Sequence, residues 1–170
     1  MTINGIDADE LHSMIGRTEG DPALGHYTFH AMTTWKGGAR SSTSIRGFIM
    51  EADEPPGLLG SDTAPNAVEQ VLSALGSCLT VGVVYVAAGR GITIHSLNFT
   101  IDGDLDIRGF LGIKGINPGY ERIRVLVHIQ ADAKRDELEA LLTTVTETSP
   151  VRDIIARNVP VKIQLAEQEC

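Results

Sequence analysis

Cysteine is scarce in this sequence, which has only Cys78 and Cys170 among its 170 residues. The two lie too far apart for a Cys-x-x-Cys pair, and they cannot build the disulfide framework of a small secreted domain. The first residues also lack the basic segment and following apolar segment of a secretory signal. We therefore expect a cytoplasmic protein without structural disulfides.

Basic residues are also few, with 14 Lys and Arg against 22 Asp and Glu and a formal net charge of −8 at pH 7. No cluster of Lys and Arg marks a face that would neutralise phosphates, so nucleic acid is not expected as a partner. The longest apolar run, around residues 79–88, contains Gly82 and is shorter than the roughly 20 residues of a membrane span. We therefore expect no membrane association.

Motifs for metals and nucleotides are missing as well. The five histidines do not show the spacing of metal ligands beside a carboxylate. The Gly-rich stretch 109–119 lacks the strand-to-helix context and the Lys-Ser/Thr of a phosphate-binding loop. The sequence therefore predicts neither a metal nor another cofactor.

What the sequence does contain is enough apolar residues, 42% against 21% charged, to fill one core. We expect a single domain over residues 1–170, with an extension at 1–25 and a core at 26–166. Helices are predicted at 7–18, 66–88, 134–149 and 150–157, and strands at 26–35, 40–50, 92–101, 121–130 and 159–165. Because the strands come in hairpins and separate blocks, without strand-helix alternation, we predict an α+β fold.

Cys78 lies in the middle of the predicted helix 66–88. Residues at helical spacing place it on one stripe with Val71, Leu75, Gly82 and Tyr85, so the thiol faces a packed surface. From this spacing alone an inert core cysteine is the favoured interpretation, because free cysteine is among the most buried residue types. The alternative is a nucleophile. A mid-helix thiol gains little from the helix dipole, so its ionisation would need a positive side chain from elsewhere.

Glu69 is the nearest charged residue along the same helix. Nine residues at about 100° each turn it roughly 180° away from Cys78, with about 13.5 Å of rise between them. The two side chains cannot meet within one straight helix. If both belong to one site, either a second copy of the helix brings Glu69 to the thiol or the helix begins irregularly. Taken alone, Glu69 is a solvated charge in the first turn, where it favours the N-terminal end of the helix dipole.

Several short motifs, in this order over residues 27–166, resemble the OsmC/Ohr family. They are Asp53-Glu-Pro, Ala64-Pro-Asn-Ala-Val-Glu69, Ala74-Leu-Gly-Ser-Cys78-Leu, Arg90-Gly-Ile, Ser149-Pro-Val-Arg-Asp and Asn158-Val-Pro-Val161. The resemblance implies antiparallel sheets around two central helices, in an intertwined homodimer with two thiol sites at its interface. Well-studied members of that family are thiol peroxidases that reduce organic hydroperoxides.

The resemblance also assigns site residues. Cys78 matches the peroxidatic cysteine, and Arg40, just after Gly37-Gly38, resembles the arginine that holds this cysteine as a thiolate. Glu69 falls near the glutamate that orients the arginine, with a spacing that differs by one. Arg46, further along the same predicted strand, is a second candidate for the arginine. For either arginine the alternative is an ordinary exposed strand position.

Ser149 departs from the family pattern. Peroxidase members carry a second cysteine there, which resolves the oxidised first cysteine as a disulfide, whereas Ser149-Pro150 has the residues of a helix N-cap followed by Pro at the first helical position. Cys170, the last residue, is interpreted as an incidental thiol rather than a replacement resolver.

Two functions from different classes remain open. The first is a single-cysteine peroxidase in which a hydroperoxide oxidises Cys78 and an external thiol regenerates it. The second is a non-catalytic protein that holds a small hydrophobic ligand at the dimer interface, where Cys78 only lines the pocket. A reactive site needs an acidic thiol, whereas a thiol buried in apolar surroundings is less acidic than free cysteine.

Overall fold

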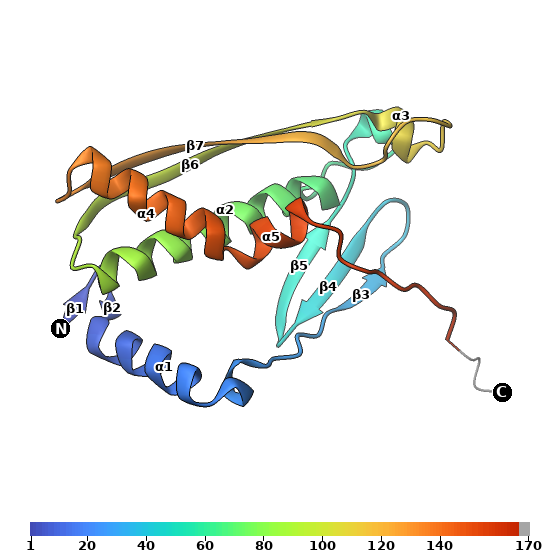
Figure 1. Ribbon diagram of the computed structural model, residues 1–170. Coiled ribbons are helices and arrows are strands. Elements are labelled where there is room, and N and C mark those ends of the chain that lie inside the picture. The colour runs from blue at the N-terminus through green and yellow to red at the C-terminus, as the bar shows by residue number, and fades with distance from the viewer. Residues whose placement is uncertain (167–170) are drawn as a thin grey trace.

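The computed structural model describes residues 1–166 and shows a mixed α+β fold (Figure 1). The helices are α1 (Ala8–Gly20), α2 (Ala67–Gly89), α3 (Ile107–Phe110), α4 (Arg135–Thr148) and α5 (Pro150–Ala156), with 3-10 turns η1 (Pro22–Gly25) and η2 (Pro56–Leu58). The strands are β1 (Thr2–Ile3), β2 (Ile6–Asp7), β3 (Met32–Trp35), β4 (Ser41–Ile45), β5 (Phe48–Ala52), β6 (Ile94–Leu105) and β7 (Tyr120–Ala131). All strand pairs are antiparallel, in the orders β1-β2, β3-β4-β5 and β6-β7.

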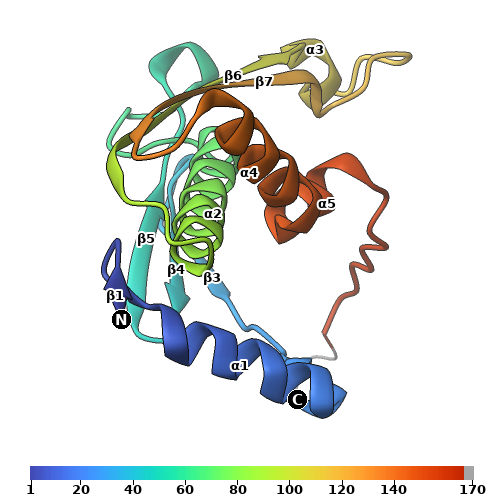
Figure 2. The same cartoon turned by 60° about the vertical axis from the view of Figure 1, so that its left-hand side comes forward.

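The main core lies where the long β6-β7 ribbon crosses α2 and α4 (Figure 1). The buried apolar residues of this core are Leu75, Leu79, Val83, Ala87, Ile92, Leu141 and Val145. Their spacing along α2, four residues apart, is the stripe of an amphipathic helix. In a view close to the axis of α2, α4 and α5 lie on one side of it and the three-stranded sheet on the other (Figure 2).

Gly82 allows α2 and α4 to approach closely. A Cβ atom at this position would lie 2.9 Å from Cγ1 of Val145, closer than side-chain carbons normally come. Val145 stands one helical turn before Ser149, which ends α4 and caps α5. The glycine on α2 therefore sets how near the α4-α5 junction lies to the residues one turn earlier on α2, including Cys78.

The predicted helix 66–88 is confirmed as α2, which begins after the N-cap Asn66 and ends at Gly89. It is longer than the apolar run seen in the sequence. By length and composition alone it could cross a membrane, a test that the core helix of a soluble protein also passes. Its apolar stripe packs against α4 and β6 in the core.

The N-terminal residues form a unit of their own at the C-terminal end of α2. Asp7 caps α1, its carboxylate accepting the amide protons of Asp9 and Glu10. The β1-β2 hairpin before it was not predicted. In its turn, the Asn4 amide donates to the carbonyl of Ile92 at 2.8 Å and accepts the amide proton of Ile94 at 2.8 Å. The hairpin is thereby tied to the start of β6.

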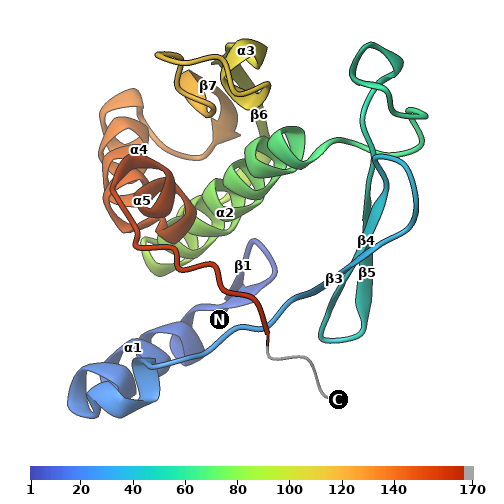
Figure 3. The ribbon, with the colours of Figure 1, turned by 90° about the vertical axis from the view of Figure 1, so that its right-hand side faces the viewer.

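The β3-β4-β5 sheet stands apart from the helices (Figure 3). The prediction of one strand over 40–50 was wrong, because Arg46 and Gly47 form a two-residue turn with φ values of 52° and 95° between β4 and β5. Two positive φ values in succession give the tight hairpin turn whose twist matches that of the strands. Strand β3 is also shorter than the predicted 26–35.

The predicted strand 159–165 is also wrong for this chain alone. Residues 157–166 have no helix or strand beyond the end of α5 and run away from the core in extended form (Figure 3). Val161, Ile163 and Leu165 alternate with polar residues, as a strand requires, but all three are exposed. The segment has the sequence of a strand and no neighbouring strand to pair with among residues 1–166.

Candidate active site

Cys78 lies at the edge of the core rather than inside it. Leu75 and Leu79, one on each side of it along α2, are buried, whereas Cys78 is only half-buried. The predicted stripe is therefore packed only in part, since Val71 and Tyr85 are exposed. A half-buried thiol is accessible to a small reagent, which an inert core cysteine is not.

Ser149 is the polar neighbour of Cys78. The Sγ atom of Cys78 lies 3.2 Å from Oγ of Ser149, and this is the only hydrogen bond of the thiol within residues 1–166. The predicted capping role is confirmed: Ser149 precedes Pro150 and its Oγ accepts the amide proton of Arg152 at 3.3 Å. Only 5% of Ser149 is exposed. Ser149, which the resemblance aligns with a second cysteine, thus faces Cys78 directly.

The structure does not bring Arg40 or Arg46 to Cys78 within one chain. Arg40 precedes β4 and its guanidinium donates to the carbonyl of Lys36, whereas Arg46 is in the turn after β4 and stacks over the ring of Phe48. Both belong to the sheet that stands apart from the helices (Figure 3). Arg46 was predicted to lie on the same strand as Arg40. It lies instead in the turn between β4 and β5.

Glu69 forms a capping box with Asn66 at the start of α2. Its Oε2 accepts the amide proton of Asn66 at 2.8 Å, and the Asn66 side chain accepts that of Glu69 at 2.9 Å. This reciprocal pair explains the glutamate structurally. Its Oε1 has no hydrogen-bond partner among residues 1–166, and it makes no contact of this kind with Cys78.

Asp53, the first residue of the Asp53-Glu-Pro motif, is a buried polar residue that no local sequence pattern singles out. Its carboxylate is 2% exposed and accepts the amide protons of Glu54, Ser61 and Thr63 together with the Thr63 hydroxyl. Burial acts to raise the pKa of Asp53, but the bonds from Thr63, Glu54 and Ser61 outweigh it and lower the pKa to about 2. Asp53 thus holds together the loop that leads into α2.

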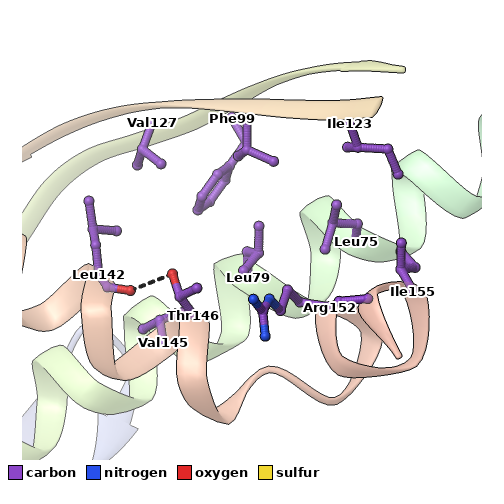
Figure 4. Close-up of a pocket in the computed structure, with 12 residues that line it drawn as sticks. Leu75, Leu79, Phe99, Ile123, Val127, Leu142, Val145, Thr146, Arg152 and Ile155 are labelled. Atoms are coloured by element: carbon purple, nitrogen blue, oxygen red, sulfur yellow. Dashed lines mark hydrogen bonds between the residues drawn. The ribbon is translucent and has the colours of Figure 1, made fainter. Parts of the chain in front are cut away.

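A cavity of about 410 Å³ lies between the β6-β7 ribbon and the helices (Figure 4). Most of the residues that line it are apolar: Leu75, Leu79, Phe99, Ile123, Val125, Val127, Leu142, Val145, Ile155 and Ala156, with Thr146 and Arg152 as the polar exceptions. The Thr146 hydroxyl donates to the carbonyl of Leu142 and is thereby satisfied. Arg152 has no ion-pair partner among residues 1–166.

The described residues hold no group of three or more His, Cys, Asp or Glu side chains that could bind a metal. Cys170, considered above as a second thiol, lies outside residues 1–166. The chemistry that the described site can support is therefore that of one accessible thiol, one buried hydroxyl next to it and an apolar cavity nearby.

Comparison with known proteins places these features in context. The sequence matches the family model described as OsmC-like protein over residues 60–164. No curated protein matches. Among solved structures, an OsmC-like protein of Mycoplasma pneumoniae has a TM-score of 0.66 at 15% identity, covering 76% of this chain and 88% of that one.

Two further structures carry functional names. An organic hydroperoxide resistance protein OsmC of Legionella pneumophila has a TM-score of 0.60 at 22% identity, covering 80% of this chain and 94% of that one. An organic hydroperoxide resistance protein of Elizabethkingia anophelis has a TM-score of 0.56 at 18% identity, covering 75% and 87%. At these identities the likeness concerns the fold.

Proposed function

Because the chain belongs to the OsmC-like family, we propose that it is a thiol-dependent peroxidase that reduces organic hydroperoxides with Cys78 as its single reacting cysteine. The observation that carries the proposal is the placement of Cys78, half-buried at the core edge and 3.2 Å from Ser149. Solved structures of the same fold include proteins named for organic hydroperoxide resistance.

The proposed reaction has two stages. The Cys78 thiolate attacks the distal oxygen of the hydroperoxide, the O–O bond breaks, and the alkoxide leaves and takes up a proton as an alcohol. The cysteine is then a sulfenic acid. An external thiol attacks its sulfur, expels water and forms a mixed disulfide, and a second thiol releases Cys78 in reduced form. Ser149 has no sulfur, so it cannot replace the external thiol that forms the mixed disulfide.

The proposal includes a homodimer, because the arginine needed to ionise the thiol is not near Cys78 in one chain. Two apolar surfaces support it: the detached β3-β4-β5 sheet exposes Trp35, Phe48 and Ile49, and the extended segment 157–166 exposes its alternating apolar residues. Apolar area of this extent is normally covered. In an intertwined pair, Arg40 would reach the Cys78 of the other subunit, and the unused Oε1 of Glu69 would accept from the guanidinium.

The proposal is tested on the Cys170→Ser protein, in which Cys78 is the only thiol. One equivalent of cumene hydroperoxide should give a sulfenic acid at Cys78, trapped with dimedone and located by mass spectrometry. Steady-state peroxide consumption should then depend on an added monothiol. The Cys78→Ser, Cys170→Ser protein is the control and should show neither result. Unmodified Cys78 after peroxide treatment would reject the proposal.

A second function is favoured by the cavity beside Arg152. An apolar chamber of about 410 Å³, with one guanidinium that has no ion-pair partner among residues 1–166, suits a small amphipathic carboxylate. The residues that line the cavity all belong to one chain. Calorimetric titration with dodecanoate tests this function, with Arg152→Gln as the matched variant. Tight, Arg152-dependent binding together with an unreactive Cys78 would make binding the better description.

A further inference from the structure

The Ser149 hydroxyl takes part in two hydrogen bonds among residues 1–166. A serine hydroxyl has one proton to donate and two lone pairs that accept. One lone pair accepts the amide proton of Arg152 at the start of α5. The proton needs an acceptor as well, and within residues 1–166 the only side-chain or backbone group within its reach is Sγ of Cys78 at 3.2 Å.

Because Ser149 is buried, its hydroxyl proton needs an acceptor within the protein. Because only 5% of Ser149 is exposed, its hydroxyl proton cannot turn to bulk water. A buried hydroxyl without an acceptor would cost free energy. A neutral thiol is a weak acceptor, but a thiolate is a charged one, and hydrogen bonds to charged acceptors are stronger than those between neutral groups. A proton on Oγ that points at Sγ therefore makes its stronger hydrogen bond to the thiolate.

We infer that Ser149 is a positioning residue for Cys78, whose hydroxyl donates to the reacting thiolate and orients it. The inference rests on the proposed function and deepens it, since it gives the residue at the position of the family's second cysteine a part in the reaction of the first. The capping of α5 uses a lone pair and not the proton. An N-cap alone could equally be Asp or Asn, which have no hydroxyl proton to donate.

The experiment measures the rate of Cys78 alkylation by iodoacetamide against pH in the Cys170→Ser background. In Ser149→Ala the midpoint of the profile should move up by about one pH unit, so that the rate well below the midpoint falls about tenfold. The rate on the high-pH plateau should stay unchanged. Ser149→Thr retains both the hydroxyl and the capping oxygen, so it should keep the original midpoint.

Two further variants separate this role from the structural one. Ser149→Gly keeps most of the N-cap preference but has no hydroxyl, so its melting temperature should stay near that of the parent while its midpoint moves as in Ser149→Ala. Thr148→Ala removes a neighbouring hydroxyl that donates to the carbonyl of Thr144, and it should move neither. An unchanged midpoint in both Ser149→Gly and Ser149→Ala would overturn the inference.

The test also separates this inference from the proposed function. If the parent protein consumes peroxide while neither Ser149 variant moves the alkylation midpoint, the function stands and the role of Ser149 is rejected. If the midpoint moves as expected but the parent protein does not react with cumene hydroperoxide, the hydrogen bond stands and the peroxidase is rejected. If the alkylation midpoint changes only in those variants whose melting temperature also changes, Ser149 acts through capping alone. That result also overturns the inference.

Discussion

The close approach of α2 and α4 at Gly82 allows a quantitative prediction for Gly82→Ala. Alanine in a helix interior is about 0.5–1 kcal/mol better than glycine. Against this, the new Cβ would lie 2.9 Å from Cγ1 of Val145, a short and stiff side chain that cannot swing aside. Overpacking of this kind costs about 1–3 kcal/mol. The free energy of unfolding should therefore fall by about 1 kcal/mol at the middle of both ranges, and by about 2.5 kcal/mol at most.

The assay is urea unfolding at one fixed protein concentration, because the stability of an oligomer depends on concentration. In the Val145→Ala background the nearest atom to the new Cβ is the Cβ of residue 145 at 3.8 Å, an ordinary contact, so Gly82→Ala should now stabilise by about 0.5–1 kcal/mol. Gly76→Ala is the control. It meets only the flexible tip of Ile101 at 3.1 Å and should be neutral or stabilising. Stabilisation by Gly82→Ala in both backgrounds would refute the reasoning.

Three further results are expected. The folded-state pKa of Asp53, about 2, lies below the ordinary 3.8, so its contribution to stability is complete above pH 3.8 and is lost as the pH falls through 2; Asp53→Asn should flatten the acid limb of the unfolding curve over this range. In the Cys170→Ser background, Ser149→Cys should form a disulfide with Cys78 after peroxide treatment, detected as loss of both remaining thiols, because the replaced Oγ already lies 3.2 Å from Sγ; two free thiols after treatment would contradict this. Arg40→Ala should move the Cys78 alkylation midpoint up by a unit or more, whereas Arg46→Ala should do little; equal effects would mean that the wrong arginine was chosen.

The helices could be predicted from the sequence because their signals are local. The start of α2 follows from Asn66 and Glu69, its end from Gly91 with its φ of 73°, and the start of α5 from Ser149-Pro150. Each signal involves residues within one or two turns of one another, so no tertiary contact was needed to recognise them.

The strands were predicted less well because their limits depend on pairing. Arg46-Gly47 was missed as a turn because strand-forming residues flank it, and only the cross-strand register shows two strands in place of one. Residues 159–165 have the alternation of a strand, but a strand forms only where a neighbouring strand exists. The alternation could not specify which strand, if any, this segment pairs with.

The site could be predicted only in part for the same reason. Cys78 and Ser149 are 71 positions apart, and their contact depends on the packing of α4 against Gly82, which no sequence periodicity encodes. Asp53 was not singled out, because its partners are loop residues without a repeating pattern. The family resemblance supplied Arg40 and Glu69, and their meeting with Cys78 stays a prediction.

The separation of the β3-β4-β5 sheet from the helices has a consequence for mixtures of defective subunits. If Arg40 serves the thiol of the other subunit, Cys78→Ser and Arg40→Ala are each inactive as pure dimers. A mixed dimer, however, combines the intact thiol of the Arg40→Ala chain with the intact arginine of the Cys78→Ser chain. Refolding the two inactive proteins together should therefore restore activity, whereas an arginine acting within its own chain would leave the mixture inactive.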